Sequence, residues 1–479
     1  MSKIFAGRGY QLSQLNALLD DVRRGGEGPG RALLMRGRRR VGKSRLLEVF
    51  CERADVPWAF YTATSGEDPQ HHRDELFRAV SAESTLPNRA WVADGTASTW
   101  DAAFRELAAM LPTDTPSIVV LDELPYMAAA DPAFEGALQT AWDRRLSRLP
   151  VLLIGVGSDL AMMELLASYG RPFHQRATEM VLPPLNPAEV GSLLSLSPAD
   201  AFDAHLITGG LPLICQEWPD RAPLLDYLSA AFTRPTSALL VSGERSLASE
   251  LPPTAQAPQV LAAIGGGGER TFTTIGTRAG VSATVLSRAL ELLMEKHLVT
   301  VDTPLSMKSG VKDKRYRIAD PYLRFWLAIG IDALPRVDRG RPDLALRLFK
   351  QRWLGWRGRA IEPIIHDALA RLLPDDAWPD VNEIGGWWPR SNIPELDIVG
   401  ADRAPVADRI LFVGSIKWRD QGAFTAADLA ALATNATAVP GTGAATQLVA
   451  VSRNGVDADV TGLAQCWTAD DLIAAWQVG

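Results

Sequence analysis

The sequence predicts an α/β fold built on a parallel sheet, followed by smaller modules and a second α/β domain. Three observations lead to this prediction. Gly37 to Ser44 reads GRRRVGKS, which fits the phosphate-binding loop pattern G-x-x-x-x-G-K-[ST]. Further along, an apolar run ends in Asp122 and Glu123, as a buried parallel strand does when it delivers carboxylates to its edge. The chain of 479 residues is too long for a single hydrophobic core, because a domain takes roughly 150 residues, so several domains are expected.

The first strand, loop and helix come in the order that phosphate binding requires. Arg31 to Met35 is a short apolar run suited to a buried strand, and Arg45 to Arg53 has the apolar spacing of a helix. Backbone N–H groups of the loop and the positive end of the helix would surround the phosphates of a nucleotide. Lys43 would reach the β and γ phosphates, and Ser44 would hold Mg²⁺. The predicted nucleotide contacts are Gly37, Arg38, Arg39, Arg40, Val41, Gly42, Lys43, Ser44 and Arg45.

The next elements add the carboxylates. Residues 57–66 predict a second strand, and the charged segment after it predicts a helix that ends near Ala82. Asp122 would organise magnesium through Ser44 or a water, and Glu123 would orient the attacking water. For the loop, the alternative to phosphate binding is a basic turn that matches the pattern by chance. For Asp122 and Glu123, the alternative to catalysis is that the two acids cap a turn. The two motifs together favour catalysis. Residues 150–160 predict a further strand, and a helix follows it.

Composition excludes several classes of protein. No apolar run approaches the 18 or so residues of a membrane span, and the first residues lack the apolar core of a signal peptide. We therefore expect a cytoplasmic protein that is not associated with a membrane. Cys51, Cys215 and Cys466 are too scattered for a disulfide framework or a zinc site. A net charge of −7 argues against a surface that binds nucleic acid all over. Lys308 to Arg359 contains 14 Lys and Arg against 5 Asp, a net of +9, so the rest carries −16. This basic block could face DNA phosphates, or it could be a solvated face or contact acidic domains.

The middle of the chain predicts a linker and a winged helix-turn-helix. Residues 236–256 are interpreted as the linker, 257–320 as the winged helix, and 321–352 as a basic, aromatic connecting segment. In the third helix of the winged helix, Ser282 is the expected cap. The expected apolar stripe is Val285, Ala289, Leu292 and Leu293. The outer face of this helix is poorly suited to DNA binding, because DNA phosphates repel its glutamates. Its charged residues are Arg288, Glu291 and Glu295. The module either binds double-stranded DNA through its wing, Lys308 to Arg317, or makes an interdomain contact.

Six segments together resemble the archaeal-type AAA+ ATPases, which are related to the signal-transducing STAND ATPases. They read FAGR, GRRRVGKS, VVLDELPYM, GS after the fourth strand, YGR, and TGGLP at Thr208 to Pro212. The resemblance implies a P-loop NTPase sheet with a helical lid over residues 1–235. It implies that Phe5, Gly7 and Arg8 line the adenine, and that Ser158 contacts the γ-phosphate or the attacking water. Arg171, or else Arg176, would be an arginine finger, which implies a homo-oligomer. Gly209, Gly210 and Pro212 would lie in the lid.

The same resemblance implies a restriction-endonuclease-like tail of the PD-(D/E)XK type over residues 353–479. Nucleases of this type use carboxylates for magnesium and a lysine to polarise water. Glu362, Asp397 and Lys417 fill three positions, but Ser415 stands where the pattern has an acid. Glu383 and Glu395 are the alternatives for that acid. A degenerate domain kept for binding is the prediction, because a hydroxyl is a poor magnesium ligand.

The leading hypothesis is therefore an ATP-hydrolysing protein whose nucleotide state moves the winged helix and the tail, with ATP and Mg²⁺ as ligands. A switch or scaffold with negligible turnover, assembled with DNA or a partner protein, is the second hypothesis. An ATP-regulated nuclease is the third.

Overall fold

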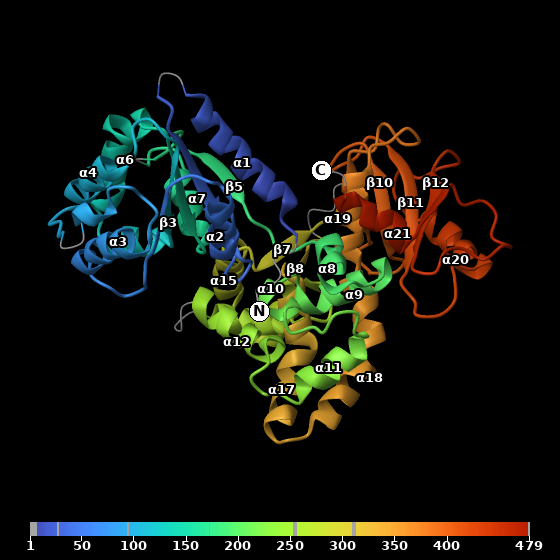
Figure 1. Ribbon diagram of the computed structural model, residues 1–479. Coiled ribbons are helices and arrows are strands. Elements are labelled where there is room, and N and C mark those ends of the chain that lie inside the picture. The colour runs from blue at the N-terminus through green and yellow to red at the C-terminus, as the bar shows by residue number, and fades with distance from the viewer. Residues whose placement is uncertain are drawn as a thin grey trace. The chain divides into compact units, whose positions relative to one another are not determined.

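The computed structural model describes residues 7–25, 28–92, 95–171, 173–251, 256–308 and 313–477 (Figure 1). The chain divides into two compact units, one spanning Arg8–Pro184 and the other Met1–Gly7 with Leu185–Gly479. This division differs from the predicted border at residue 235. Gly209, Gly210 and Pro212, which were expected to lie in the lid of the first domain, belong to the C-terminal unit.

A five-stranded parallel sheet with the order β2-β3-β4-β1-β5 forms the N-terminal unit. Its inner strands are the most apolar, and every residue of β3 and β4 is buried. All the strands point the same way, so the residues that follow them collect at one edge. The strands predicted from residues 31–35, 57–66, 117–123 and 150–160 are confirmed. Their bounds are β1 Arg31–Arg36, β2 Trp58–Thr62, β3 Ser117–Asp122, β4 Val151–Gly157 and β5 Thr178–Val181.

Seven α-helices accompany this sheet in the described part of the unit, and side-chain caps begin three of them. Asp68, Thr99 and Asp159 each accept a hydrogen bond from a backbone N–H in the first turn of α3, α4 and α7. The core between α4 and α6 is aromatic, with ring centroids of Trp100 and Phe134 4.9 Å apart. The helices are α1 Gly9–Arg24, α2 Lys43–Arg53, α3 Pro69–Glu83, α4 Trp100–Met110, α5 Leu124–Ala130, α6 Phe134–Arg144 and α7 Leu160–Ala167.

The C-terminal unit begins with a group of helices. Gly210, after α9, requires a glycine, because its φ is 64° and a Cβ would lie 1.9 Å from the carbonyl oxygen of Leu185. The interpretation of residues 236–256 as a linker was wrong for most of that stretch, since Ala238–Glu250 is helix α12. Buried Leu239 and Leu240 hold this helix in place. The other helices are α8 Pro187–Leu194, α9 Pro198–Thr208, α10 Pro212–Cys215 and α11 Leu224–Phe232.

Three helices and a small antiparallel sheet, with the order β6-β8-β7, occupy the region expected to be a winged helix. Ser282 caps α15 through the N–H of Val285, as predicted. The apolar stripe was partly misplaced: Leu286 and Leu290 are buried, whereas Val285 and Leu292 are half-buried. The elements are α13 Ala257–Ile264, β6 Arg270–Thr271, α14 Phe272–Ala279, α15 Ala283–Glu295, β7 Val299–Asp302 and β8 Arg315–Ile318.

The tail is a five-stranded mixed sheet with the order β13-β12-β11-β10-β9. The strands β9, β10 and β11 pair antiparallel, while β11, β12 and β13 pair parallel. The predicted border at residue 353 falls inside α18, a continuous helix, so it does not separate two domains. The strands are β9 Glu383–Trp387, β10 Leu396–Ala401, β11 Ile410–Lys417, β12 Gln447–Ser452 and β13 Gln465–Trp467. The helices from residue 321 onward are α16 Pro321–Phe325, the π-helical turn Trp326–Gly330, α17 Ile331–Asp338, α18 Pro342–Ala360, α19 Glu362–Leu372, α20 Ala426–Ala436 and α21 Ala469–Ile473.

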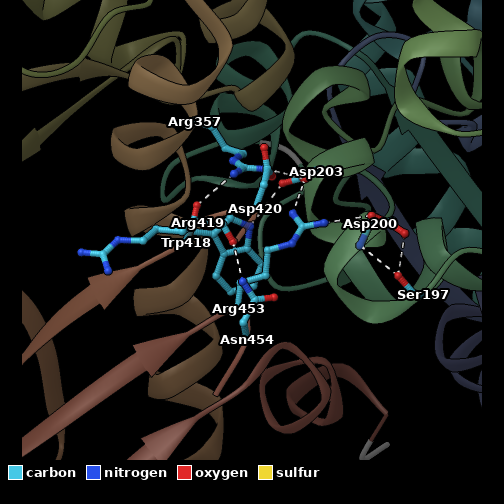
Figure 2. Close-up of polar contacts among 9 residues, drawn as sticks. All are labelled: Ser197, Asp200, Asp203, Arg357, Trp418, Arg419, Asp420, Arg453 and Asn454. Carbon is cyan, nitrogen blue, oxygen red and sulfur yellow. Dashed lines mark hydrogen bonds and ion pairs between the residues drawn. The ribbon is translucent and has the colours of Figure 1, made fainter. Parts of the chain in front are cut away.

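A buried ion cluster joins α9 to the tail (Figure 2). Asp203 on α9 accepts a hydrogen bond from Nη1 of Arg357 at 2.9 Å and from Nε1 of Trp418 at 3.2 Å, and it also pairs with Arg453. Arg357, on α18, is 1% exposed and also pairs with Asp420 at 2.6 Å. One arginine of the basic block thus neutralises an acidic residue of a neighbouring element instead of facing solvent.

Candidate active site

The loop between β1 and α2 needs glycine at two points. A Cβ on Gly37 would lie 2.5 Å from the carbonyl oxygen of Leu182, and Gly42 begins α2 with a φ of 91°. Inside the loop, Nζ of Lys43 donates to the carbonyl oxygens of Gly37 at 2.7 Å and Arg38 at 3.1 Å. Burial lowers the pKa of Lys43 to about 8, an effect that the nearby carboxylates of Glu123 and Asp122 oppose. The loop therefore holds an ammonium group next to backbone N–H groups at a helix start, which suits phosphates.

A hydroxyl and a carboxylate meet at the C-terminal edge of the sheet. Oγ of Ser44 donates to Oδ2 of Asp122 at 2.6 Å, although the two residues lie on α2 and β3. Asp122 is 1% exposed, and burial raises its pKa while the bond from Ser44 opposes the rise. Magnesium in nucleotide sites is held by one or two protein oxygens, with water and phosphate completing the shell. These two side chains fit that role.

Glu123 is turned toward the end of β4. Its φ is 57°, in the left-handed region, and it stands directly before α5. Its Oε2 accepts hydrogen bonds from Oγ of Ser158 at 2.9 Å and from the N–H of Ser158 at 3.3 Å. The structure thus brings together the ends of two adjacent strands, and the carboxylate that the sequence assigns to water activation has a fixed orientation.

An open pocket of about 340 Å³ is lined by Lys43, Ser44, Glu123 and Ser158, and Asp122 contacts this lining through its hydrogen bond with Ser44. One lining residue was missed from the sequence: Tyr126, on the first turn of α5, accepts a hydrogen bond from Nη2 of Arg39 at 2.6 Å. The only signal was its place three residues after Glu123, which brings it to the same helix end. The lining residues are Arg39, Arg40, Gly42, Lys43, Ser44, Arg45, Glu123, Tyr126 and Ser158.

Several residues predicted to contact nucleotide do not line this pocket, among them Gly37, Arg38 and Val41 of the loop. Arg8 is 3% exposed and donates from Nη2 to the carbonyl oxygen of Val41 at 2.9 Å, so it supports the loop from the start of α1. Phe5 lies outside the described residues. Gly7 and Pro212, the first residue of α10, belong to the other compact unit.

Both candidate arginine fingers are engaged within their own unit. Nη2 of Arg171 lies 2.5 Å from Oε1 of Glu135, and Arg176 makes a bidentate pair with Asp143 at 2.8 and 2.9 Å. Neither arginine lines the pocket. An arginine that acts on the nucleotide would therefore have to leave its carboxylate, or act on a neighbouring copy.

The tail brings its predicted residues together as well. Oδ2 of Asp397 accepts hydrogen bonds from Oγ of Ser415 at 2.9 Å and the N–H of Ile416 at 2.8 Å, and Nζ of Lys417 donates to Oγ of Ser415 at 2.9 Å. Ser415 thus joins Asp397 to Lys417. Glu362 shares a cavity of about 310 Å³ with Asp397, and burial, followed by the charge of Asp397, raises the pKa of Glu362 well above its usual value.

The two alternative acids of the tail also line this cavity. Glu395 pairs with Arg315 of β8, whose guanidinium stacks 4.1 Å from the ring centroid of Trp388, and Glu383 begins β9. In the part of the chain that the structure describes, no three His, Cys, Asp or Glu side chains group closely enough to hold a metal ion.

Residues 4–154 match the family model described as "AAA ATPase domain". This part of the chain is similar to AAA ATPase domains, and we call it the AAA domain below. The AAA domain contains the loop, Ser44, Asp122 and Glu123, and its parallel sheet has the P-loop NTPase fold. No described helix has both the length and the apolar character needed to cross a membrane.

Other similarities extend further along the chain. An uncharacterized protein of Methanocaldococcus jannaschii is 24% identical over 423 residues, which cover 87% of this chain and 88% of that protein. The Walker-type ATPase PABY2304 of Pyrococcus abyssi aligns with 69% of this chain and 96% of its own, at 18% identity and a TM-score of 0.47. The ORC2 protein of Aeropyrum pernix, solved as ADPNP–ADP complexes, aligns with 72% of this chain and 96% of its own, at 11% identity and a TM-score of 0.46.

Proposed function

We propose that the protein binds ATP with magnesium and hydrolyses it, and that the bound nucleotide controls the C-terminal unit. The observation that supports hydrolysis best is that Lys43, Ser44 and Glu123 line one pocket and that Asp122 accepts a hydrogen bond from Ser44. Lys43 binds the β and γ phosphates. Ser44 and Asp122 hold magnesium, which supplies positive charge to the phosphate oxygens when it is bound.

Glu123 takes the role of orienting and polarising water. Its carboxylate is held by Ser158 at 2.9 Å, so its direction is set before substrate arrives. A positioned base that accepts a proton contributes about 10²- to 10⁴-fold to a rate. The remaining acceleration comes from cations that neutralise charge on the transferred phosphoryl group, a role that Lys43 and an arginine can fill.

Two substitutions separate binding from chemistry. Lys43→Ala removes a charge-assisted contact worth about 1.5–3 kcal/mol, so ATP affinity should fall by roughly 10- to 150-fold. Glu123→Gln should leave ATP affinity within about threefold and lower turnover by at least about 100-fold, because only water activation is lost. Nucleotide binding is measured with a fluorescent ATP analogue, and turnover is measured by phosphate release.

Arg105→Ala is the matched control, since this arginine is exposed and pairs with Glu106 on α4, outside the pocket. Both quantities should stay at the wild-type value in this variant. If wild type, Lys43→Ala and Glu123→Gln bind and hydrolyse ATP equally, the assignment of the pocket is wrong.

A switch with slow turnover is the second candidate function. The ion pairs of Arg171 with Glu135 and of Arg176 with Asp143 favour it, because they keep both predicted fingers occupied in the single chain. On this proposal a neighbouring copy or a partner protein releases an arginine and raises the rate. Turnover measured against protein concentration, with and without duplex DNA, distinguishes the switch from a constitutive ATPase.

DNA binding through the wing has weaker support. In the described part of the basic block, Arg315 pairs with Glu395, and Arg317 pairs with Asp302 at 2.6 Å. The charge of these two arginines is already compensated, so they add little to phosphate binding by the wing. We propose that the tail acts by binding and does not cleave DNA, because Ser415 stands between Asp397 and Lys417 where an acidic ligand is needed.

A further inference from the structure

A groove lies along the outer edge of the AAA sheet, apart from the phosphate loop. In the order β2-β3-β4-β1-β5, the strand β2 is an edge strand. A cavity of about 500 Å³ opens on it between α2 and α3, and none of its lining residues lines the phosphate pocket. The proposed function gives this groove no role.

The floor of the groove offers unpaired backbone groups. Residues 57 and 63 bond inward to β3, through Ile118 N–H to the Pro57 carbonyl and Ala63 N–H to the Asp122 carbonyl. Trp58 points the other way, since its N–H donates to Oγ1 of Thr85 at 2.8 Å and its carbonyl accepts from the N–H of Thr85 at 2.9 Å.

Backbone groups alternate direction along a strand, so Phe60 and Thr62 also point outward. Within the described ranges, neither residue has a hydrogen-bond partner for its outward N–H or C=O. Phe60 is half-buried and Thr62 is exposed. Such an open edge is a template for another strand.

The walls of the groove are acidic. α2 contributes Glu48 and Glu52, α3 contributes Glu75 and Glu83, and the lining contains no lysine or arginine. Glu48 and Glu52 both pair with Arg45, and Glu75 pairs with Arg78, but these pairs are at the surface and are worth little. The one imidazole of the lining, His71, has its Nε2 4.0 Å from a carboxylate oxygen of Glu75. Burial raises the pKa of Cys51 to about 12, and the charges of Glu52 and Glu48 add to that rise.

We infer that this groove binds an extended basic segment of a partner protein, which adds to β2 as an extra strand. The segment pairs its backbone with Phe60 and Thr62, and its lysine or arginine side chains approach the glutamates of α2 and α3. This is strand addition, in which main-chain bonds give affinity and alternate side chains give specificity. Nucleic acid does not fit, since four glutamates repel phosphates.

The inference is tested by fluorescence anisotropy with a fluorescein-labelled heptapeptide of alternating lysine and valine, added to the full-length protein. Saturable binding is expected. Methylation of the peptide's backbone nitrogens on one edge removes its donors and should weaken binding at least about tenfold, a loss of about 1.4 kcal/mol. An alternating glutamate and valine peptide should not bind.

Protein variants complete the test. Glu52→Lys with Glu75→Lys should weaken binding at least about tenfold, whereas the control Glu106→Lys on α4 should leave it unchanged. Phe60→Pro deletes one outward N–H and should also weaken binding, and ATP affinity reports whether each variant is folded.

Four outcomes would overturn the inference. They are absence of saturable binding to wild type, equal binding of the methylated peptide, equal binding of the glutamate peptide, and binding that the double charge reversal does not change. Sedimentation distinguishes a separate partner protein from a second copy of this chain. Self-association that the lysine peptide abolishes would show that a second copy fills the groove, and would contradict the inference of a separate partner. None of these results depends on ATP turnover.

Discussion

Asp203→Ala should open the contact between α9 and the tail. Asp203 is 4% exposed and faces two guanidinium groups, those of Arg357 and Arg453. Removing the carboxylate leaves both cations with less compensation, and Nε1 of Trp418 loses its acceptor. Breaking a buried pair by removing one partner costs about 3–5 kcal/mol.

The expected free-energy cost of Asp203→Ala lies at the lower end of that range. Arg357 keeps its contact with Asp420, and Arg453 keeps its contact with Asp200 at 2.9 Å, so neither cation is left without a carboxylate. About 3 kcal/mol corresponds to a roughly 150-fold increase in the constant for local opening. Asp200→Ala is the control on the same helix. Asp200 is 57% exposed, so losing its ion pair with Arg453 should cost less than about 1 kcal/mol.

Hydrogen–deuterium exchange of the full-length protein, read from peptides that cover α9 and residues 410–420, measures local opening directly. In α9 and residues 410–420, the Asp203→Ala protein should exchange at least about tenfold faster than the Asp200→Ala protein. In β3 and β4 of the AAA domain, the two variants should exchange at the same rate. Exchange rates that agree within about threefold between the two variants would refute the reasoning, because the cluster would then behave like a surface ion pair.

Three further predictions concern other sites. Arg171→Ala should lower ATP turnover by up to about 10³-fold with ATP affinity nearly unchanged, and a specific rate that stays flat on dilution would exclude action on a neighbouring copy. Wild type should not cleave linear, supercoiled or single-stranded DNA in magnesium or manganese, and Ser415→Glu should create or raise metal-dependent cleavage. Wild-type cleavage that Lys417→Ala abolishes would contradict this prediction. Burial lowers the pKa of His205 to about 4. Its neutral form therefore stabilises the fold fully above about pH 6.5, and this stability is lost as the pH falls toward 4, by up to about 3 kcal/mol. In His205→Gln, the free energy of unfolding measured with urea should depend less on pH between about 6.5 and 4. An unchanged dependence would contradict the lowered pKa of His205 as its cause.

Four of the five strands of the AAA sheet and the helices that follow β1, β2 and β4 could be predicted, because each is encoded by a short pattern. Apolar runs predicted the four strands, and the glycine loop predicted the turn before α2. The hydrogen bond from Ser44 to Asp122 could also be anticipated, since parallel strands end at one edge. Tyr126 was missed because its role depends on Arg39 reaching across from the loop. The helix α12 was interpreted as a linker because its turn-forming residues outweighed its apolar ones. The contacts that hold it, hydrogen bonds from Tyr322 and Trp326 to the carbonyls of Leu239 and Leu240, come from far along the chain.

The sequence by itself determined the order of elements, the phosphate loop and the acids after β3, since these depend on neighbours within a few residues. Only the tertiary structure decided which charges are compensated. Arg357 and Asp203 are 154 positions apart, and the pairing of Arg315 with Glu395 spans 80. The sequence therefore left open whether the basic block faces DNA phosphates, solvent or acidic residues of other elements, and the structure holds several of its arginines in ion pairs. Burial raises the cost of an unpaired charge, and no local pattern reveals which side chains the fold will bury together.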